Sequence, residues 1–232
     1  MRVIGIIGYK NSGKTTLIEN ILKNSNYKIG VVKHSHVEDK GDTQRFFNSG
    51  AEVTILSSDE KTTIFTKPKK LENILSLLLN YNLDFVLIEG FKEELTKLNI
   101  PKIVMLINKE GNELIDDHTV YVIEDYNYDI NEVLKIIEEK AIIPTMNLNC
   151  GHCGYNCYRF VKALAKNEVK WNDCVLSNNI RIVVDDKIIP TVPFVSKIVT
   201  NTILGLITSL KGVNNPKTIK ITIKMDKNGE ER

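Results

Sequence analysis

A short apolar run followed directly by a glycine- and lysine-containing loop dominates the start of this sequence. Residues 3–7 are all apolar or glycine and predict a buried strand. Residues 8–15 then read G-Y-K-N-S-G-K-T, which fits the pattern G-x-x-x-x-G-K-[ST], and apolar residues at helical spacing follow from Leu17. Strand, loop and helix therefore occur in the order of a phosphate-binding loop, and the chain is expected to fold around this unit.

Each part of this loop predicts a contact with a nucleoside triphosphate. The glycines let the backbone curl so that several amide groups face one phosphate, and the following helix adds the positive end of its dipole. Lys14 would reach the β- and γ-phosphates, and the hydroxyl of Thr15 would bind Mg²⁺. The alternative is an ordinary glycine-rich turn, which does not require the Lys-Thr pair. The candidate nucleotide-binding residues here are Gly8, Asn11, Ser12, Gly13, Lys14, Thr15 and Thr16.

Composition and charge narrow the class of protein. A chain of 232 residues with 42% hydrophobic content can bury one substantial core and a smaller second unit. The formal net charge is only +2, so neither nucleic acid nor an anionic membrane is an expected partner. No apolar run approaches a membrane-spanning length and no signal peptide precedes the first strand, which predicts a soluble, cytoplasmic protein.

Alternating strand and helix patterns predict an α/β fold. We expect a three-layer P-loop NTPase with a mostly parallel sheet in a domain of residues 1–143. The predicted strands of this sheet are residues 3–7, 29–32, 53–56, 85–88, 103–107 and 120–123, with an extra hairpin or edge strand at 62–65. The predicted helices are residues 15–23, 43–48, 71–79 and 130–140.

The magnesium shell of such a loop needs a second acidic group, at the end of another buried strand. Residues 85–88 are apolar and are followed by Glu89, which therefore falls at the same sheet edge as the loop. Asp84 lies at the opposite end of that strand, and we favour a structural role for it. We predict that Glu89 binds Mg²⁺ together with Thr15, and that Lys14 and Glu89 carry whatever catalysis occurs.

Two further residues are candidates at this edge. His34 follows the second predicted strand and would contact phosphate or metal. Asp42 comes shortly afterwards and is a candidate metal ligand, although it could instead cap the predicted helix at residues 43–48. For either residue, a polar surface loop is the other interpretation.

Several stretches of the sequence together resemble the molybdopterin-guanine dinucleotide biosynthesis protein B (MobB) family. They are residues 8–16, 31–36, 42–45 with 49–51, and 87–92 with 101–103. The resemblance extends over about residues 1–140, and its Lys33-His34-x-His36 and Ile88-Glu89-Gly-Phe-Lys92 pieces are more specific than the phosphate loop. The segment between His36 and Asp42 is shorter than is usual in the family.

This resemblance implies a function and partners. Members bind GTP with Mg²⁺, hydrolyse it slowly at most and are often homodimers. They assist a MobA-type guanylyltransferase that attaches GMP to the molybdenum or tungsten pterin, so a contact with molybdopterin is also conceivable. Two other functions stay open on the residues alone: a P-loop small-molecule kinase, and a redox-responsive module that binds nucleotide.

The four cysteines of the chain are confined to one short segment. Cys150, Cys153, Cys157 and Cys174 have the spacing C-x2-C-x3-C-x16-C, with a predicted helix at residues 158–166 between the last two. This spacing looks like that of short iron–sulfur domains, although the gap between the second and third cysteines is one residue shorter. We expect a [4Fe–4S] cluster, with a structural Zn²⁺ and separate free thiols as the alternatives.

The segments after the nucleotide domain predict two smaller modules. Residues 141–149 look like a linker, the cysteine module covers residues 150–176, and residues 177–232 form a small α+β module. Its predicted elements are a hairpin of residues 180–184 and 188–189, a helix of residues 195–210 and a strand of residues 219–223.

Overall fold

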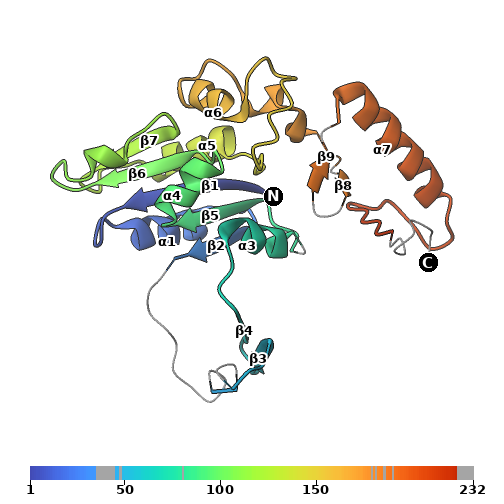
Figure 1. Ribbon diagram of the computed structural model, residues 1–232, viewed down its shortest axis with the longest axis horizontal. Helices are drawn as coiled ribbons and strands as arrows, with labels where there is room; N and C mark the ends of the chain where they lie inside the picture. Colours follow the sequence, from blue (N-terminus) through green and yellow to red (C-terminus); the bar gives the residue numbers. More distant parts are fainter. Residues whose placement is uncertain are drawn as a thin grey trace. The chain divides into compact units, whose positions relative to one another are not determined.

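In the computed structural model, a five-stranded parallel sheet in the order β2-β5-β1-β6-β7 forms the core of the first part of the chain (Figure 1). Its strands are β1 (Arg2–Gly8), β2 (Ile29–Lys33), β5 (Phe85–Glu89), β6 (Lys102–Leu106) and β7 (Thr119–Glu124). The structure describes residues 1–34, 45–46, 49–79, 81–178, 180, 182–184, 187–189 and 191–223. The chain divides into two compact units, Met1–Ser177 and Asn178–Arg232.

Alternating side chains of the sheet pack into two separate hydrophobic clusters, one on each face. On β1, Ile4 and Ile6 pack with α1 (Lys14–Asn24) and α5 (Ile130–Lys140), because successive side chains of a strand point to opposite faces. Val3 and Ile7 instead pack with α3 (Leu71–Leu78) and α4 (Lys92–Lys97). The expected three-layer α/β fold is therefore confirmed, and α4 is an element that the sequence patterns did not predict.

The site-forming loops gather at one edge of this sheet. All five strands run in parallel, so the segments that follow β1, β2, β5 and β7 emerge at the same carboxyl edge. In the register of the sheet, Glu89 lies opposite both Ile6 of β1 and Lys33 of β2. The acidic residue is thus held between the strand that leads into the phosphate-binding loop and the strand that ends in Lys33.

One predicted strand lies outside the central sheet. Residues 53–56 were expected in the parallel sheet, but β3 (Val53–Ser57) pairs with β4 (Thr62–Thr66) in a separate antiparallel hairpin. The extra hairpin strand expected at residues 62–65 is confirmed. A tight turn in which Ser58 and Lys61 are hydrogen bonded connects the two strands. Residues 53–57 therefore form their backbone hydrogen bonds with β4 and not with a strand of the central sheet. Of the helix expected at residues 43–48, the structure describes only residues 45–46, which are helical.

The cysteine segment belongs to the first unit and has its own small core. Its elements are α6 (Cys157–Ala165) and two short 3-10 helices, η2 (Trp171–Asp173) and η3 (Val175–Ser177). Their apolar side chains pack around Ile142, which forms a bridge to Val3 of β1 through backbone hydrogen bonds of 2.6 and 3.1 Å. Residues 141–149, expected as a linker, lie within one compact unit with the cysteine segment, and Ala141, Ile142 and Thr145 are buried.

Side chains also join α6 to the nucleotide domain. Asp117, in the connection between η1 (Asn112–Leu114) and β7, accepts hydrogen bonds from Tyr158 (2.7 Å) and Lys162 (2.9 Å) of α6. The neighbouring His118 is fully buried against the ring of Tyr158, and this burial lowers its pKa. At the end of α5, the buried ammonium of Lys140 donates to the carbonyl of Leu164 at 2.6 Å.

The second unit is small. β8 (Ile182–Val184) and β9 (Lys187–Ile189) form the expected hairpin, and α7 (Pro193–Thr208) follows. The strand expected at residues 219–223 is wrong, because this described segment has no regular structure. Its alternating isoleucines need a neighbouring strand to pair with, and in the described part of the unit β8 pairs with β9 alone. None of the described helices is long and apolar enough to cross a membrane.

Candidate functional site

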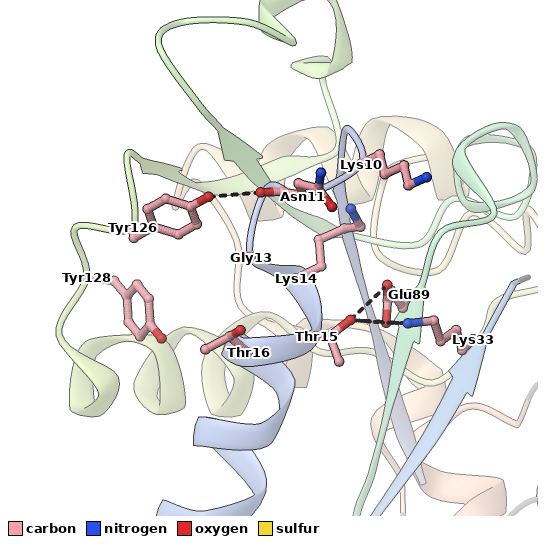
Figure 2. A pocket seen from close by; sticks show the side chains of 10 residues that line it. All are labelled: Lys10, Asn11, Gly13, Lys14, Thr15, Thr16, Lys33, Glu89, Tyr126 and Tyr128. Carbon is pink, nitrogen blue, oxygen red and sulfur yellow. Dashed lines mark hydrogen bonds and ion pairs between the residues drawn. The ribbon is translucent and has the colours of Figure 1, made fainter.

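A cleft of about 730 Å³ opens beside the loop of residues 8–16 (Figure 2). The side chains that line it come from the loop, from the ends of β2 and β5, and from the segment after β7. They are Lys10, Asn11, Gly13, Lys14, Thr15, Thr16, Lys33, Glu89, Tyr126 and Tyr128. The structure thus brings together six of the residues predicted for nucleotide or magnesium: Asn11, Gly13, Lys14, Thr15, Thr16 and Glu89.

The other two predicted loop residues, Gly8 and Ser12, do not line the cleft but determine the conformation of the loop. A Cβ atom on Gly8 would lie 2.4 Å from the Oγ of Ser12 and 2.6 Å from the carbonyl oxygen of Met105, so only glycine fits. Ser12 is 3% exposed. Gly13 has φ of 83° at the start of α1, a left-handed conformation that glycine adopts without strain. The loop conformation therefore depends on the glycines that the motif requires.

Lys14 is bent back across the loop. Its ammonium donates hydrogen bonds to the carbonyl oxygen of Tyr9 at 2.5 Å and to the Oγ of Ser12 at 3.3 Å. Partial burial lowers the pKa of Lys14, and Glu89 opposes this effect. The ammonium thus lies in the mouth of the loop, held by weak acceptors that a phosphate group could replace.

Thr15, Glu89 and Lys33 form a second polar group at the sheet edge. The hydroxyl of Thr15 lies 3.4 Å from both carboxylate oxygens of Glu89. The ammonium of Lys33 donates to Thr15 Oγ1 at 3.1 Å and forms an ion pair of 3.1 Å with Glu89 Oε2. A cation therefore already bridges the hydroxyl and the carboxylate, and here it is a lysine side chain.

Two tyrosines at the other side of the cleft were not predicted. Tyr126 donates a hydrogen bond of 2.9 Å to the carbonyl of Asn11, and its ring lies against Gly13. The hydroxyl of Tyr128 accepts a hydrogen bond of 2.7 Å from Asn20 of α1. Figure 2 shows both tyrosines on the side of Lys14 away from Glu89. The available signal was their position just after β7, at the same sheet edge as the loop.

The remaining predicted residues have different outcomes. His34 lies beside Glu89, where its backbone amide donates to the Glu89 carbonyl at 3.0 Å, but its ring stacks on Phe91 and does not line the cleft. Asp42 lies outside the described residues. Its expected roles as metal ligand or helix cap therefore stay predictions.

The four cysteines surround one small cavity of about 20 Å³. Two glycines, Gly151 and Gly154, turn the chain between them with φ of 72° and 81°. The backbone amide of Asn149 donates to Cys157 Sγ at 3.3 Å, which is a contact of the kind that stabilises a sulfur ligand. The predicted cysteine set is thus brought together by the loop of residues 145–157 and by η2, which precedes Cys174.

The chemistry of this cavity suits a metal centre that carries positive charge. Burial and the neighbouring cysteines raise the pKa of Cys174 to about 11. Four thiolates in such surroundings would repel one another without a bound cation, whereas metal binding favours their deprotonation. In the part of the chain that the structure describes, however, no three His, Cys, Asp or Glu side chains converge closely enough to hold a single metal ion. Four cysteine thiolates are the donor set of both iron–sulfur clusters and structural Zn²⁺ sites.

Comparison with protein families gives two matches. Residues 3–125 match the model described as "Molybdopterin guanine dinucleotide synthesis protein B". Residues 147–176 match a model described as "Putative Fe-S cluster". The first match covers the cleft and the second covers all four cysteines.

Curated proteins and solved structures give similar results. A Methanocaldococcus jannaschii protein named "Putative molybdopterin-guanine dinucleotide biosynthesis adapter protein" is 64% identical over 232 residues, covering 98% of this chain and 99% of its own. A Haemophilus influenzae adapter protein of the same biosynthesis is 34% identical over 145 residues, 57% of this chain and 79% of its own. The crystal structure of Bacillus subtilis MobB aligns with a TM-score of 0.48 and 24% identity, over 59% of this chain and 98% of its own.

Proposed function

Because the chain belongs to the molybdopterin guanine dinucleotide synthesis protein B (MobB) family, we propose that it binds GTP with Mg²⁺ in the cleft beside residues 8–16. In this proposal it serves as an adapter in the biosynthesis of molybdopterin-guanine dinucleotide. The observation that carries the proposal is the meeting of Lys14, Thr15 and Glu89 at one cleft. These are the three side chains that a nucleotide and its magnesium ion require.

The charge of the cleft supports an anionic ligand. Lys10, Lys14 and Lys33 line it, whereas Glu89 is the one carboxylate among its described lining residues. A triphosphate would replace the carbonyl of Tyr9 as the partner of Lys14, because an anionic oxygen is a stronger acceptor for an ammonium group than a neutral one. The start of α1 would add its amide groups and dipole to the same phosphates.

The magnesium ion would take the position between Thr15 and Glu89 that the Lys33 ammonium has in this structure. Thr15 and Glu89 offer a hydroxyl and a carboxylate oxygen, and oxygen ligands are the ones that Mg²⁺ prefers. Displaced from this position, Lys33 would be free to pair with a phosphate oxygen. We infer that Lys33, which pairs with Glu89 in this structure, would neutralise a phosphate group once Mg²⁺ binds Glu89.

The nucleoside would occupy the opposite side of the cleft. Tyr126, Tyr128 and Thr16 line this side, and an exposed aromatic ring is a suitable surface for stacking a base. The phosphates would then extend past Lys14 towards Glu89, in the direction that Figure 2 shows.

Slow hydrolysis at most follows from the same geometry. Glu89 is already engaged by Thr15 and Lys33, which suits a magnesium ligand better than a general base for water. A small-molecule kinase would need an acceptor cavity that adjoins the phosphate end of the cleft. The next described cavity, lined by Lys102 and Asp116 among others, shares no lining residue with the cleft, so this alternative has less support.

Calorimetric titration of the full-length protein with GTP and with ATP, each with and without Mg²⁺, tests the proposal. We expect binding of Mg²⁺-GTP in preference to Mg²⁺-ATP, with weaker binding when the metal is chelated. A preference for ATP would refute the guanine assignment, and no binding of either nucleotide would refute the whole proposal.

For the cysteine segment we propose a [4Fe–4S] cluster held by Cys150, Cys153, Cys157 and Cys174. The match of residues 147–176 to an Fe-S model supports it. The cavity gives further support, because all four cysteines line it and their thiolates could therefore bind one shared centre.

We further propose a homodimer that binds a MobA-type guanylyltransferase, with molybdopterin as a possible further ligand. The hairpin β3–β4 supports an assembly, because Val53, Ile55 and Ile64 are all more than half exposed. Light scattering after size-exclusion chromatography, alone and with the guanylyltransferase, measures both interactions. We expect twice the mass of one chain, and co-elution with the enzyme. A monomer that elutes separately from the enzyme would contradict both.

A further inference from the structure

Thr145 is a buried residue whose side-chain hydroxyl has no partner within the protein. The residue is 1% exposed, and among the residues that the structure describes none forms a hydrogen bond with its Oγ1. A buried hydroxyl without a partner destabilises a folded protein, because the hydrogen bonds it makes to water in the unfolded chain are not replaced. A threonine in this position therefore suggests a partner that the polypeptide itself does not supply.

The local turn does not need this hydroxyl. The turn that begins at Thr145 is closed by its backbone carbonyl, which accepts a hydrogen bond of 3.0 Å from the amide of Leu148. Serine and threonine often stabilise turns by accepting a bond from a nearby backbone amide, but no such bond forms here. The role of a turn-forming hydroxyl is thus ruled out by the hydrogen-bond pattern.

Thr145 instead belongs to the wall of the cysteine cavity. Thr145 lines it together with all four cysteines. The other lining residues are Tyr155 and four apolar ones: Leu148, Phe160, Val175 and Leu176. In such apolar surroundings each polar hydrogen that reaches a sulfur atom has a large electrostatic effect, because little else screens the charge.

A second donor comes from the same turn. The backbone amide of Asn149 already donates to Cys157 Sγ at 3.3 Å, and the side-chain oxygen of Asn149 accepts from the Cys157 amide at 2.8 Å. The segment of residues 145–149 therefore carries one donor directed at a cysteine sulfur and a second, unused one in the wall of the same cavity.

We propose that the Thr145 hydroxyl donates a hydrogen bond to a sulfur atom of the iron–sulfur cluster and thereby raises the reduction potential of that cluster. This inference rests on the cluster assigned under the proposed function. Reduction adds negative charge that spreads onto the sulfur atoms, so a donor stabilises the reduced form more than the oxidised form. Thr145 is in this sense a residue that tunes the centre without being one of its ligands.

The variants Thr145→Val and Thr145→Ser separate the hydroxyl from the rest of the side chain. Valine keeps the shape of threonine and removes the donor, whereas serine keeps the donor and removes a methyl group. Both are prepared as full-length protein beside the wild type and reconstituted anaerobically with iron and sulfide. Iron and sulfide content, the visible spectrum and the midpoint potential are then measured.

We expect all three proteins to bind the same amount of iron. The midpoint potential of T145V should be more negative than that of the wild type, and T145S should remain close to the wild type. A wild-type protein that takes up no iron would refute the cluster, and this inference with it, before any variant is compared. A cluster-bearing T145V with the potential of the wild type would refute the role of Thr145 alone.

Stability of the metal-free proteins gives a second, independent measurement. Because its unpaired hydroxyl is a cost in the absence of the cluster, we expect metal-free T145V to unfold at the same or a higher urea concentration than the wild type. Trp171, the one tryptophan of the chain, lies in the adjacent hydrophobic cluster and reports this unfolding by fluorescence. A clearly less stable metal-free T145V would mean that the hydroxyl has a structural role, and would overturn the inference.

Discussion

Replacing Lys14 with alanine is expected to weaken the binding of Mg²⁺-GTP about a hundred-fold or more without unfolding the protein. A hydrogen bond to a charged group contributes about 1.5–3 kcal/mol, so two such contacts with phosphate exceed about 3 kcal/mol. Each 1.4 kcal/mol corresponds to about ten-fold in affinity. The fold should persist because the hydrogen bonds that Lys14 donates within the described part of the chain go to Tyr9 and Ser12 of its own loop, and burial there disfavours its charge.

Calorimetric titration of K14A with Mg²⁺-GTP measures this loss. Lys23→Ala is the matched control, because Lys23 is an exposed lysine in the last turn of the same helix, at the end remote from the cleft. It removes the same charge and should change the affinity by less than about three-fold, as expected for a screened charge at a distance. If K14A bound Mg²⁺-GTP as tightly as K23A, the loop would not be the phosphate site.

Replacing Cys174 with serine is expected to abolish stable binding of the iron–sulfur cluster. The first three cysteines lie within eight residues of one another. Cys174 is distant from them in sequence, because α6 and η2 come between, and it is the fourth cysteine that lines the cavity. A serine hydroxyl is not a soft ligand and is a poor substitute for a thiolate on iron. The expected result is a colourless protein with little iron after anaerobic reconstitution.

Metal analysis and the visible spectrum of C174S, beside the wild type, test this expectation. His152→Ala is the control, because His152 is an exposed residue between two of the proposed ligands. It should retain the iron of the wild type. An H152A protein that loses its iron while C174S keeps it would show that the ligand set is wrong. If the wild-type protein contained one zinc ion and no iron, the cluster proposal would be refuted and a structural Zn²⁺ site would be supported instead.

The cleft beside residues 8–16 could be predicted in large part because its determinants are local in sequence. The order of strand, loop and helix at residues 3–16 positions Lys14 and Thr15, and parallel pairing alone places Glu89 at the same edge. Tyr126 and Tyr128 could not be assigned in this way, because a tyrosine after a strand has no motif. Their role emerges only once the segment after β7 is seen against Asn11 and Gly13.

The errors in the predicted fold have two causes, an unknown strand partner and a helix too short for a pattern. An apolar run indicates a strand but not its partner, and residues 53–56 pair with their neighbour in sequence instead of joining the sheet. The alternating isoleucines at residues 219–223 form no strand, since alternation favours a strand only where a neighbouring strand supplies the backbone hydrogen bonds. The helix α4 was missed because its six residues are too few to show a periodicity.

The bridge between Val3 and Ile142 determines where this chain can be shortened. Ile142 is fully buried and packs with Phe160, Leu164 and Trp171, so the cysteine segment covers it. A chain that ends at residue 143, the domain boundary predicted from the sequence, would expose the apolar side chain of Ile142 to solvent at its C-terminus and would tend to aggregate. A chain ended at residue 177 keeps this cover, and we expect it to be the shorter form that can be produced without precipitation.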